Sequence, residues 1–266
     1  MKKDLLKLYS VLSMAAMLLL TGCATERPSD LTMDELEIKM AQAMDPDGSY
    51  RRANSYFQRQ NVEEKGFWST DRQMVEVKFQ RPDKFKFSYY EKNKIASEIL
   101  SKDNRAWMID YQKGTVTELA GDAMEKIKLM LALGHPDTDY DKIFDKVALS
   151  LVELEDGREY YKMVCQPRIQ DSHPIIIYVD KLESLPKRMI LKVKTPNGTV
   201  NSTSNIEKYH FFNNLKLPDL TRVEDGSREY TTRVVGYQLD AKFNADAFEL
   251  PKFDPVLMEV EKQKKR

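Results

Sequence analysis

The sequence is poor in the residues from which most enzymatic sites are built. Its 266 residues include two cysteines, three histidines and ten glycines. The histidines, His135, His173 and His210, lie far apart, and the first two precede a proline, which is typical of turn or surface residues rather than metal ligands. No nucleophile elbow, glycine-rich phosphate loop or Cys-x-x-Cys motif is present. We therefore expect no enzyme, no cofactor and no metal.

One acidic run imitates part of a metal site. Asp137, Asp139 and Asp141 have the spacing of the first three ligands of a calcium-binding loop. The sixth position of such a loop would be Lys142, where glycine is needed for the sharp turn, and the twelfth would be Ala148 instead of glutamate. The acidic start of a helix is the better interpretation.

The chain also lacks an excess of charge of either sign, with 42 basic and 42 acidic residues. A protein that binds nucleic acid needs cationic side chains to neutralise phosphates, so we expect no nucleic-acid partner. Basic residues do gather at the C-terminus, but glutamates lie among them. We interpret residues 252–266 as a charged, solvated tail rather than a binding arm.

The only long apolar run lies at the N-terminus. It extends from about Leu8 to Leu20 behind a basic start, and it fits a signal-peptide core while being too short to anchor the chain across a bilayer. It ends in Leu20-Thr21-Gly22-Cys23, which matches the bacterial lipobox. In lipoproteins with this motif the cysteine sulfur receives a diacylglyceryl group and the cysteine becomes the first residue of the mature chain.

We predict the following organisation of the chain. Residues 1–22 form a lipoprotein signal peptide, residues 23–31 a tether, and residues 32–251 a single domain. Lipidation of Cys23 would attach the protein to a membrane, and Ala24, in place of an aspartate that can retain lipoproteins at the inner membrane, favours the periplasmic face of the outer membrane. The alternative is an ordinary secretory signal that happens to contain a cysteine.

The second cysteine, Cys165, has no partner, because a lipidated Cys23 cannot form a disulfide. An unpaired thiol in an exported protein is either buried or exposed to oxidation. Tyr161, Met163 and Cys165 alternate on one face of a predicted strand, which favours a small, buried, apolar cysteine over a reactive thiol.

Helical signals occur at the start and in the middle of the domain. Thr32 and Glu35 have capping-box spacing ahead of a helical apolar pattern, which Pro46 and Gly48 end. A second helix is predicted from Asp122, as its cap, to about residue 133. A short third helix is predicted over residues 141–146.

The remaining segments alternate with period two. The period switches to two from about residue 56, and strands are predicted around residues 74–79, 85–89, 95–102, 107–111, 115–119, 148–153, 159–165, 175–180, 188–195, 202–212 and 230–239. Turn signals such as Asp103-Asn104 and Asn197-Gly198 separate several of them. Consecutive strands joined by tight turns predict an antiparallel meander, so the fold class is α+β with one long sheet.

A sheet of this length twists and curls toward a half-barrel. We expect its inner face to carry nine apolar side chains: Phe85, Phe87, Tyr89, Trp107, Ile109, Tyr111, Met189, Leu191 and Val193. The other face carries mainly lysine, glutamate and arginine and is expected to face water. The predicted helices are too few to cover the inner face, which favours a hydrophobic cavity, although a fully packed core remains an equal alternative.

Several short motifs resemble one known family. They are Arg81-Pro82-Asp83-Lys84-Phe85-Lys86-Phe87, then the segment from Asp103 to Tyr111, then Leu185-Pro186-Lys187-Arg188-Met189 before a hairpin, and finally Asp246-Ala247-Phe248-Glu249-Leu250-Pro251. The chain resembles the bacterial lipoprotein-carrier and outer-membrane lipoprotein-receptor family. It departs at Asn104, where that family commonly has glycine, and in an insertion over residues 121–147.

The resemblance implies an unclosed, strongly curved antiparallel sheet with helices capping a hydrophobic cavity. It also implies non-covalent binding of the acyl chains of lipids or lipoproteins, in lipid or lipoprotein transport. The competing hypothesis is a structural or assembly lipoprotein with a packed core that binds a protein partner.

Overall fold

The computed structural model describes residues 26–65, 70–195, 198–226 and 228–253. The signal peptide, the lipobox with Cys23 and all but the start of the predicted tail lie outside these residues.

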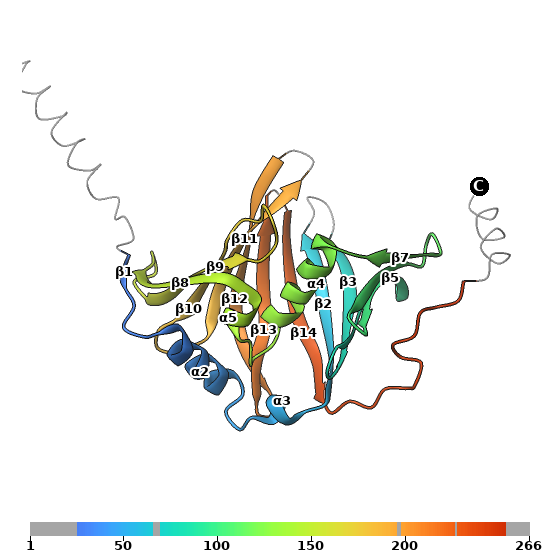
Figure 1. Cartoon of the computed structure of the whole chain (residues 1–266), viewed down its shortest axis with the longest axis horizontal. Coiled ribbons are helices and arrows are strands. Elements are labelled where there is room, and N and C mark those ends of the chain that lie inside the picture. Colours follow the sequence, from blue (N-terminus) through green and yellow to red (C-terminus); the bar gives the residue numbers. More distant parts are fainter. Residues whose placement is uncertain (1–25, 66–69, 196–197, 227, 254–266) are drawn as a thin grey trace, which may run out of the picture.

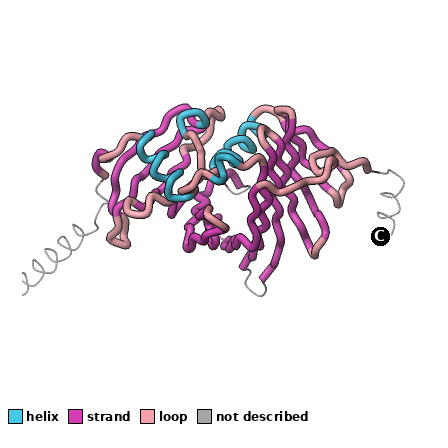
Figure 2. Tube along the Cα trace, turned by 90° about the horizontal axis from the view of Figure 1, so that it is seen from below, coloured by secondary structure: helices cyan, strands magenta, loops and turns pink. Residues whose placement is uncertain are grey.

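The described residues form one antiparallel sheet of 14 strands in the order β1-β8-β9-β10-β11-β12-β13-β14-β2-β3-β4-β5-β6-β7. The strands are β1 (Arg27–Pro28), β2 (Ser55–Lys65), β3 (Thr70–Gln80), β4 (Lys84–Glu91), β5 (Lys94–Lys102), β6 (Arg105–Asp110), β7 (Thr115–Leu119), β8 (Phe144–Glu153), β9 (Glu159–Pro167), β10 (Ile175–Asp180), β11 (Pro186–Thr195), β12 (Gly198–Phe212), β13 (Leu215–Asp225) and β14 (Arg228–Leu239). The edge strands β1 and β7 do not pair with each other, so the sheet is open, and Figure 2 shows its two halves curving around the helices. The predicted α+β half-barrel is confirmed.

In the middle of the sheet, β14, the last strand along the chain, pairs with β2. From β2 the strands run outward to the edge strand β7, and the chain resumes near the opposite edge at β8. The connection from β7 to β8 must therefore cross the whole sheet. It does so on the concave side through α4 (Asp122–Leu133) and α5 (Tyr140–Ile143), as Figure 1 shows.

The N-terminal helix α2 (Met33–Met44) forms as predicted. The Thr32 Oγ1 accepts from the Glu35 N–H at 3.3 Å, and the Glu35 carboxylate accepts from the Thr32 N–H at 2.8 Å, which completes the capping box. Leu36, Met40 and Met44, one turn apart, are buried against strands β8–β11. This helix covers one half of the concave face.

Four local features differ from the sequence-based expectation. Residues 27–28 of the predicted tether pair with β8 as β1, and a one-turn helix, α3 (Ser49–Arg52), follows α2. The short helix near residue 141 ends at Ile143, because Phe144 is already the first residue of β8 and pairs with Pro167 of β9. The helix α4 is capped by Gly121, with Asp122 as its first residue and no side-chain cap.

Strand β13 has no counterpart among the predicted strands. It contains Pro218, and proline is rarely found inside a sheet because it has no N–H to donate. Here Pro218 lies opposite Tyr209, next to a register shift in β12. The irregular pairing at this point accommodates the proline in the middle of the sheet.

The prediction that nine apolar side chains share the inner face is wrong for three of them. Phe85, Phe87, Tyr89, Met189, Leu191 and Val193 lie on the concave face, whereas Trp107, Ile109 and Tyr111 lie on the outer face.

The reason is the turn between β5 and β6. Asp103 and Asn104 form a two-residue turn with positive φ angles of 51° and 57°, and Lys102 pairs with Arg105 across it. An even position therefore stands opposite an odd one. Over most of β4 and β5 odd positions stand opposite odd ones, so the odd positions of β6 lie on the other face from those of β4.

The outer face of β5 and β6 is correspondingly buried rather than solvated. Leu100, Trp107, Ile109 and Phe248 are buried together, and Phe253 packs against them from the segment after β14. That segment follows the right-hand half of the sheet in Figure 1. The domain therefore has a second core, which is covered by the segment after β14 as far as Phe253, the second residue of the predicted tail.

The burial predicted for Cys165 is confirmed. Its side chain is fully buried on the concave face beside Tyr161 and Met163, and burial raises the pKa of the thiol to about 12. Cys165 is therefore a neutral part of the apolar core.

Candidate functional site

The helix α4 lies between the two halves of the concave face and contacts both. Met124 and Ile127 are buried against Ala106 of β6. On other sides of the helix, Leu129 and Leu133 pack against the cluster of α2 and β8–β11. The helix thereby connects two apolar clusters that the curvature of the sheet holds apart.

A cavity of about 690 Å³ opens beside α4, a volume typical of small-molecule sites. We call it the α4 cavity. One helical stripe, with residues 122, 126, 129, 130 and 133, forms one wall. The loop after β9 and strands β10 and β11 form the others, and the apolar lining includes Leu129, Met130, Leu133, Ile169, Ile175, Met189, Leu191 and Val193.

A second, smaller cavity of about 280 Å³ lies on strands β4–β6, and we call it the β4 cavity. Its lining includes Phe87, Tyr89, Ile99 and Met108. The register places all four on the concave face, the same face that α4 covers.

The two cavities account for five of the nine side chains predicted to line one hydrophobic site. Met189, Leu191 and Val193 line the α4 cavity, and Phe87 and Tyr89 line the β4 cavity. Phe85 belongs to the packed core on β2–β4. Trp107, Ile109 and Tyr111, on the outer face, line neither cavity.

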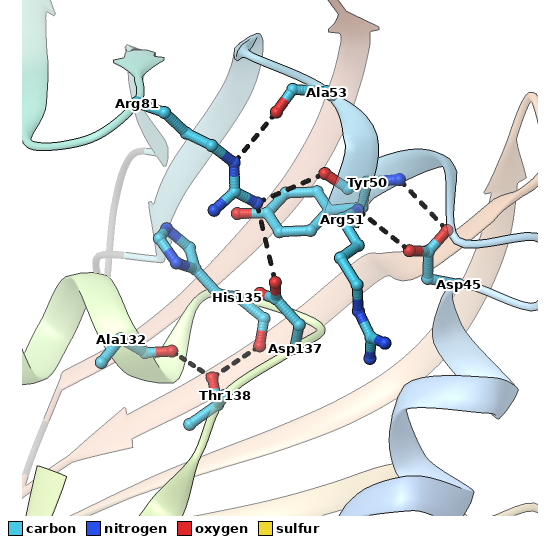
Figure 3. Close-up of polar contacts among 9 residues, drawn as sticks. All are labelled: Asp45, Tyr50, Arg51, Ala53, Arg81, Ala132, His135, Asp137 and Thr138. Atoms are coloured by element: carbon cyan, nitrogen blue, oxygen red, sulfur yellow. Dashed lines mark hydrogen bonds and ion pairs between the residues drawn. The ribbon is translucent and has the colours of Figure 1, made fainter. Parts of the chain in front are cut away.

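The loop after α4 is fastened to the sheet through Arg81, at the turn between β3 and β4 (Figure 3). The Arg81 Nε–H donates to the Ala53 carbonyl at 2.9 Å, and another guanidinium N–H donates to the Tyr50 carbonyl at 3.4 Å. The same guanidinium lies 3.6 Å from the Asp137 carboxylate and 5.6 Å from the centre of the Tyr50 ring. One cation thus ties α3 and its C-terminal cap, Ala53, to the loop that follows α4.

His135, in the same loop, inserts its ring among aromatic side chains. Its ring centroid lies 5.0 Å from that of Phe79, 5.7 Å from that of Tyr50 and 6.1 Å from that of Tyr56. The His135 Nε2 and the Tyr50 hydroxyl are both buried without a hydrogen-bond partner in the described part of the chain. Burial lowers the pKa of His135 to about 4, against an opposing effect of Asp137, so the imidazole is neutral at pH 7.

Sequence patterns identify neither Arg81 nor His135 as a key residue. Arg81 stands in a motif shared with the resembled family, but its role depends on contacts with Tyr50, Ala53 and Asp137, which are distant along the chain. Because His135 precedes a proline, the sequence predicts a turn or surface position for it. It does lie in a turn, but its imidazole ring packs among aromatic side chains of the core.

The aspartates that have the spacing of a calcium-binding loop have separate structural roles here. Asp137 pairs with Arg81, and Asp139 caps α5 by accepting from the Lys142 N–H at 3.1 Å. Across the described residues, no group of three or more His, Cys, Asp or Glu side chains is arranged to hold a metal ion. None of the helices described is both long and apolar enough to cross a membrane.

No family model matches the sequence, and no curated protein sequence matches it. Solved structures do share its fold. A LolA superfamily protein from Nitrosomonas europaea has a TM-score of 0.56 at 13% identity, over 83% of this chain and 98% of that one. A domain named for outer membrane lipoprotein sorting, from Vibrio parahaemolyticus, has a TM-score of 0.57 at 9% identity, over 81% and 95% of the two chains.

A DUF1329 family protein from Desulfovibrio piger is similar to the same degree, with a TM-score of 0.55 at 12% identity, over 81% of this chain and 95% of that one. At such identities the likeness concerns the fold. The open, curved sheet with helices on its concave side is therefore an architecture that this chain shares with LolA superfamily and lipoprotein-sorting proteins.

The buried imidazole of His135 predicts a specific pH dependence of stability. Its pKa in the folded protein, about 4, is below its ordinary value of 6.5, so the unfolded chain takes up the proton first as the pH falls. The contribution of neutral His135 to the free energy of unfolding is fully present above pH 6.5 and is lost between pH 6.5 and 4. It amounts to about 3 kcal/mol at most. Urea unfolding measures this. Between pH 7.5 and 4.5, the free energy of unfolding of His135→Phe should fall by about 2 kcal/mol less than that of the wild type. Equal losses would contradict the assignment.

Proposed function

We propose that this chain is a membrane-anchored envelope lipoprotein that binds the acyl chains of lipids or lipoproteins and acts in their transport. The observation that carries the proposal is the α4 cavity, an apolar space of about 690 Å³ on the concave face of the sheet. Met130 of its wall is 47% exposed, an apolar surface that a bound chain would cover.

The energetics fit a ligand with one acyl chain. Each methylene removed from water contributes about 0.8 kcal/mol, so burial of about a dozen carbons contributes roughly 10 kcal/mol. Association itself costs about 4–15 kcal/mol in lost freedom. Chain burial alone therefore supports binding of modest strength, and methionines such as Met130 and Met189 adapt to chains of different shape.

The edge strand β7 supports a second candidate function. Its residues 115–118 are exposed, and β7 is the last strand in the order, so its free edge could pair with a strand of a protein partner. In that case the protein would be a structural or assembly lipoprotein, and the concave face would serve only for packing.

The membrane attachment is part of the proposal and rests on the lipobox sequence. Acylation of Cys23 would place the domain close to a membrane, at the periplasmic face of the outer membrane if Ala24 acts as expected. A single mature lipoprotein would then combine an anchor with a cavity for a further acyl chain.

A pair of matched substitutions separates the two functions. Leu191, half-buried at the α4 cavity, and Ile109, fully buried on the outer face, would each be replaced by glutamate. Leu191→Glu should leave the domain folded, because the carboxylate can reach water through the cavity, and should weaken binding of a fluorescent fatty acid at least tenfold. Ile109→Glu should unfold the domain, because an unpaired buried charge costs several kcal/mol.

Circular dichroism and the fatty-acid titration measure the two effects on the same samples. If Leu191→Glu unfolded the domain as Ile109→Glu does, and the wild type bound no fatty acid, the packed structural lipoprotein would be the better account.

The anchor has its own test. Cys23→Ser should abolish lipidation and leave an unprocessed precursor, because the thiol is the acyl acceptor. Metabolic labelling with a fatty-acid probe measures this, with Cys165→Ser as the control that should still carry label. A labelled Cys23→Ser protein would rule out the lipobox interpretation.

A further inference from the structure

The rim of the α4 cavity carries charges of both signs. Asp122 and Lys126 lie one turn apart on the helical stripe that lines the cavity, and Asp171 lines it from the loop after β9. All three side chains are exposed. Lys192 also lines the cavity, but alternation along β11 places its side chain on the opposite face from Leu191, so its ammonium does not belong to the rim.

The three rim charges have no partners within the described part of the chain, where none of them makes an ion pair or a side-chain hydrogen bond. This differs from the neighbouring charges on the same helix. Glu125 and Lys128, which do not line the cavity, pair with each other at 3.0 Å. The unpaired charges of α4 are thus the ones that face the cavity.

Polarity changes along the stripe of α4. Asp122 and Lys126 come first, and Leu129, Met130 and Leu133 follow on the same side of the helix. An amphiphile lying along this wall matches the gradient in one direction only. Its polar group would lie at the N-terminal end of α4 and its chain would run toward Leu133.

We propose that the ligand is an amphiphile whose headgroup carries both a phosphate and an ammonium group, an inference that rests on the proposed function. A purely anionic headgroup near Lys126 would share the cavity with the negative charges of Asp122 and Asp171, and a purely cationic one would share it with Lys126. A zwitterionic headgroup offers its phosphate to Lys126 and its ammonium to the two aspartates. It therefore gives each rim charge a partner of opposite sign.

The test uses three single-chain lipids that share one saturated acyl chain: lysophosphatidylethanolamine, lysophosphatidylglycerol and the uncharged monoacylglycerol. The protein is the mature chain with Cys23 replaced by serine, and binding is measured by displacement of a fluorescent acyl probe. The ethanolamine lipid should bind about tenfold more tightly than either of the others, which corresponds to one charge-assisted hydrogen bond.

Three variants assign the preference to the rim. Lys126→Gln should weaken binding of the ethanolamine lipid about tenfold and leave the monoacylglycerol unaffected, and Asp171→Asn should weaken it in the same way. Lys128→Gln, on the same helix but outside the cavity, is the matched control and should change neither. Circular dichroism confirms that each variant is folded.

The outcomes separate the two proposals. If no acyl lipid binds the wild type, the proposed function fails. If all three lipids bind equally, or Lys126→Gln behaves as Lys128→Gln does, acyl binding stands and the headgroup inference is overturned. Tighter binding of lysophosphatidylglycerol than of lysophosphatidylethanolamine would also overturn it, because the rim would then select net negative charge.

Discussion

The connection from β7 to β8 is the constraint on which the rest of the structure depends. These two strands lie near opposite edges of an open sheet, and residues 120–143 must carry the chain from one to the other. Because the sheet is curved, the short path leads across its concave side. The helix α4 lies on this path, so topology alone places a helix over the apolar face.

The same constraint explains why space remains beneath α4. A single helix of 12 residues contacts both halves of a wide concave surface and cannot fill the distance between them. The ends of this crossing are fixed differently. The loop that follows α4 is held by Arg81 and by the buried ring of His135, whereas the start of α4 has no side-chain cap and borders the charged rim of the cavity. The cavity is thus bordered by a firmly attached end and a more accessible one.

Local patterns predict much of this fold but not all of its geometry. The capping box of Thr32 and Glu35, the alternation within strands such as β9 and the burial of Cys165 depend on near neighbours, and the structure confirms them. Alternation fixes which residues of one strand share a face, but the turn decides how that face continues into the next strand. The register set by the two-residue turn at Asp103 and Asn104 therefore places the side chains of Trp107 and Ile109 on the outer face. The contacts of Arg81 and His135 join distant segments, and sequence periodicity contains no information about such contacts.

The central claim is that the concave face holds an acyl chain, and mass spectrometry of the purified protein tests it most directly. The mature chain with Cys23 replaced by serine would be expressed in a bacterial envelope, purified without detergent and analysed under native conditions, and its lipids would then be extracted and identified. The account predicts a population of protein carrying one acyl lipid, which is depleted in Leu191→Glu. A folded wild-type protein that carries no lipid and takes up none from added vesicles would contradict it.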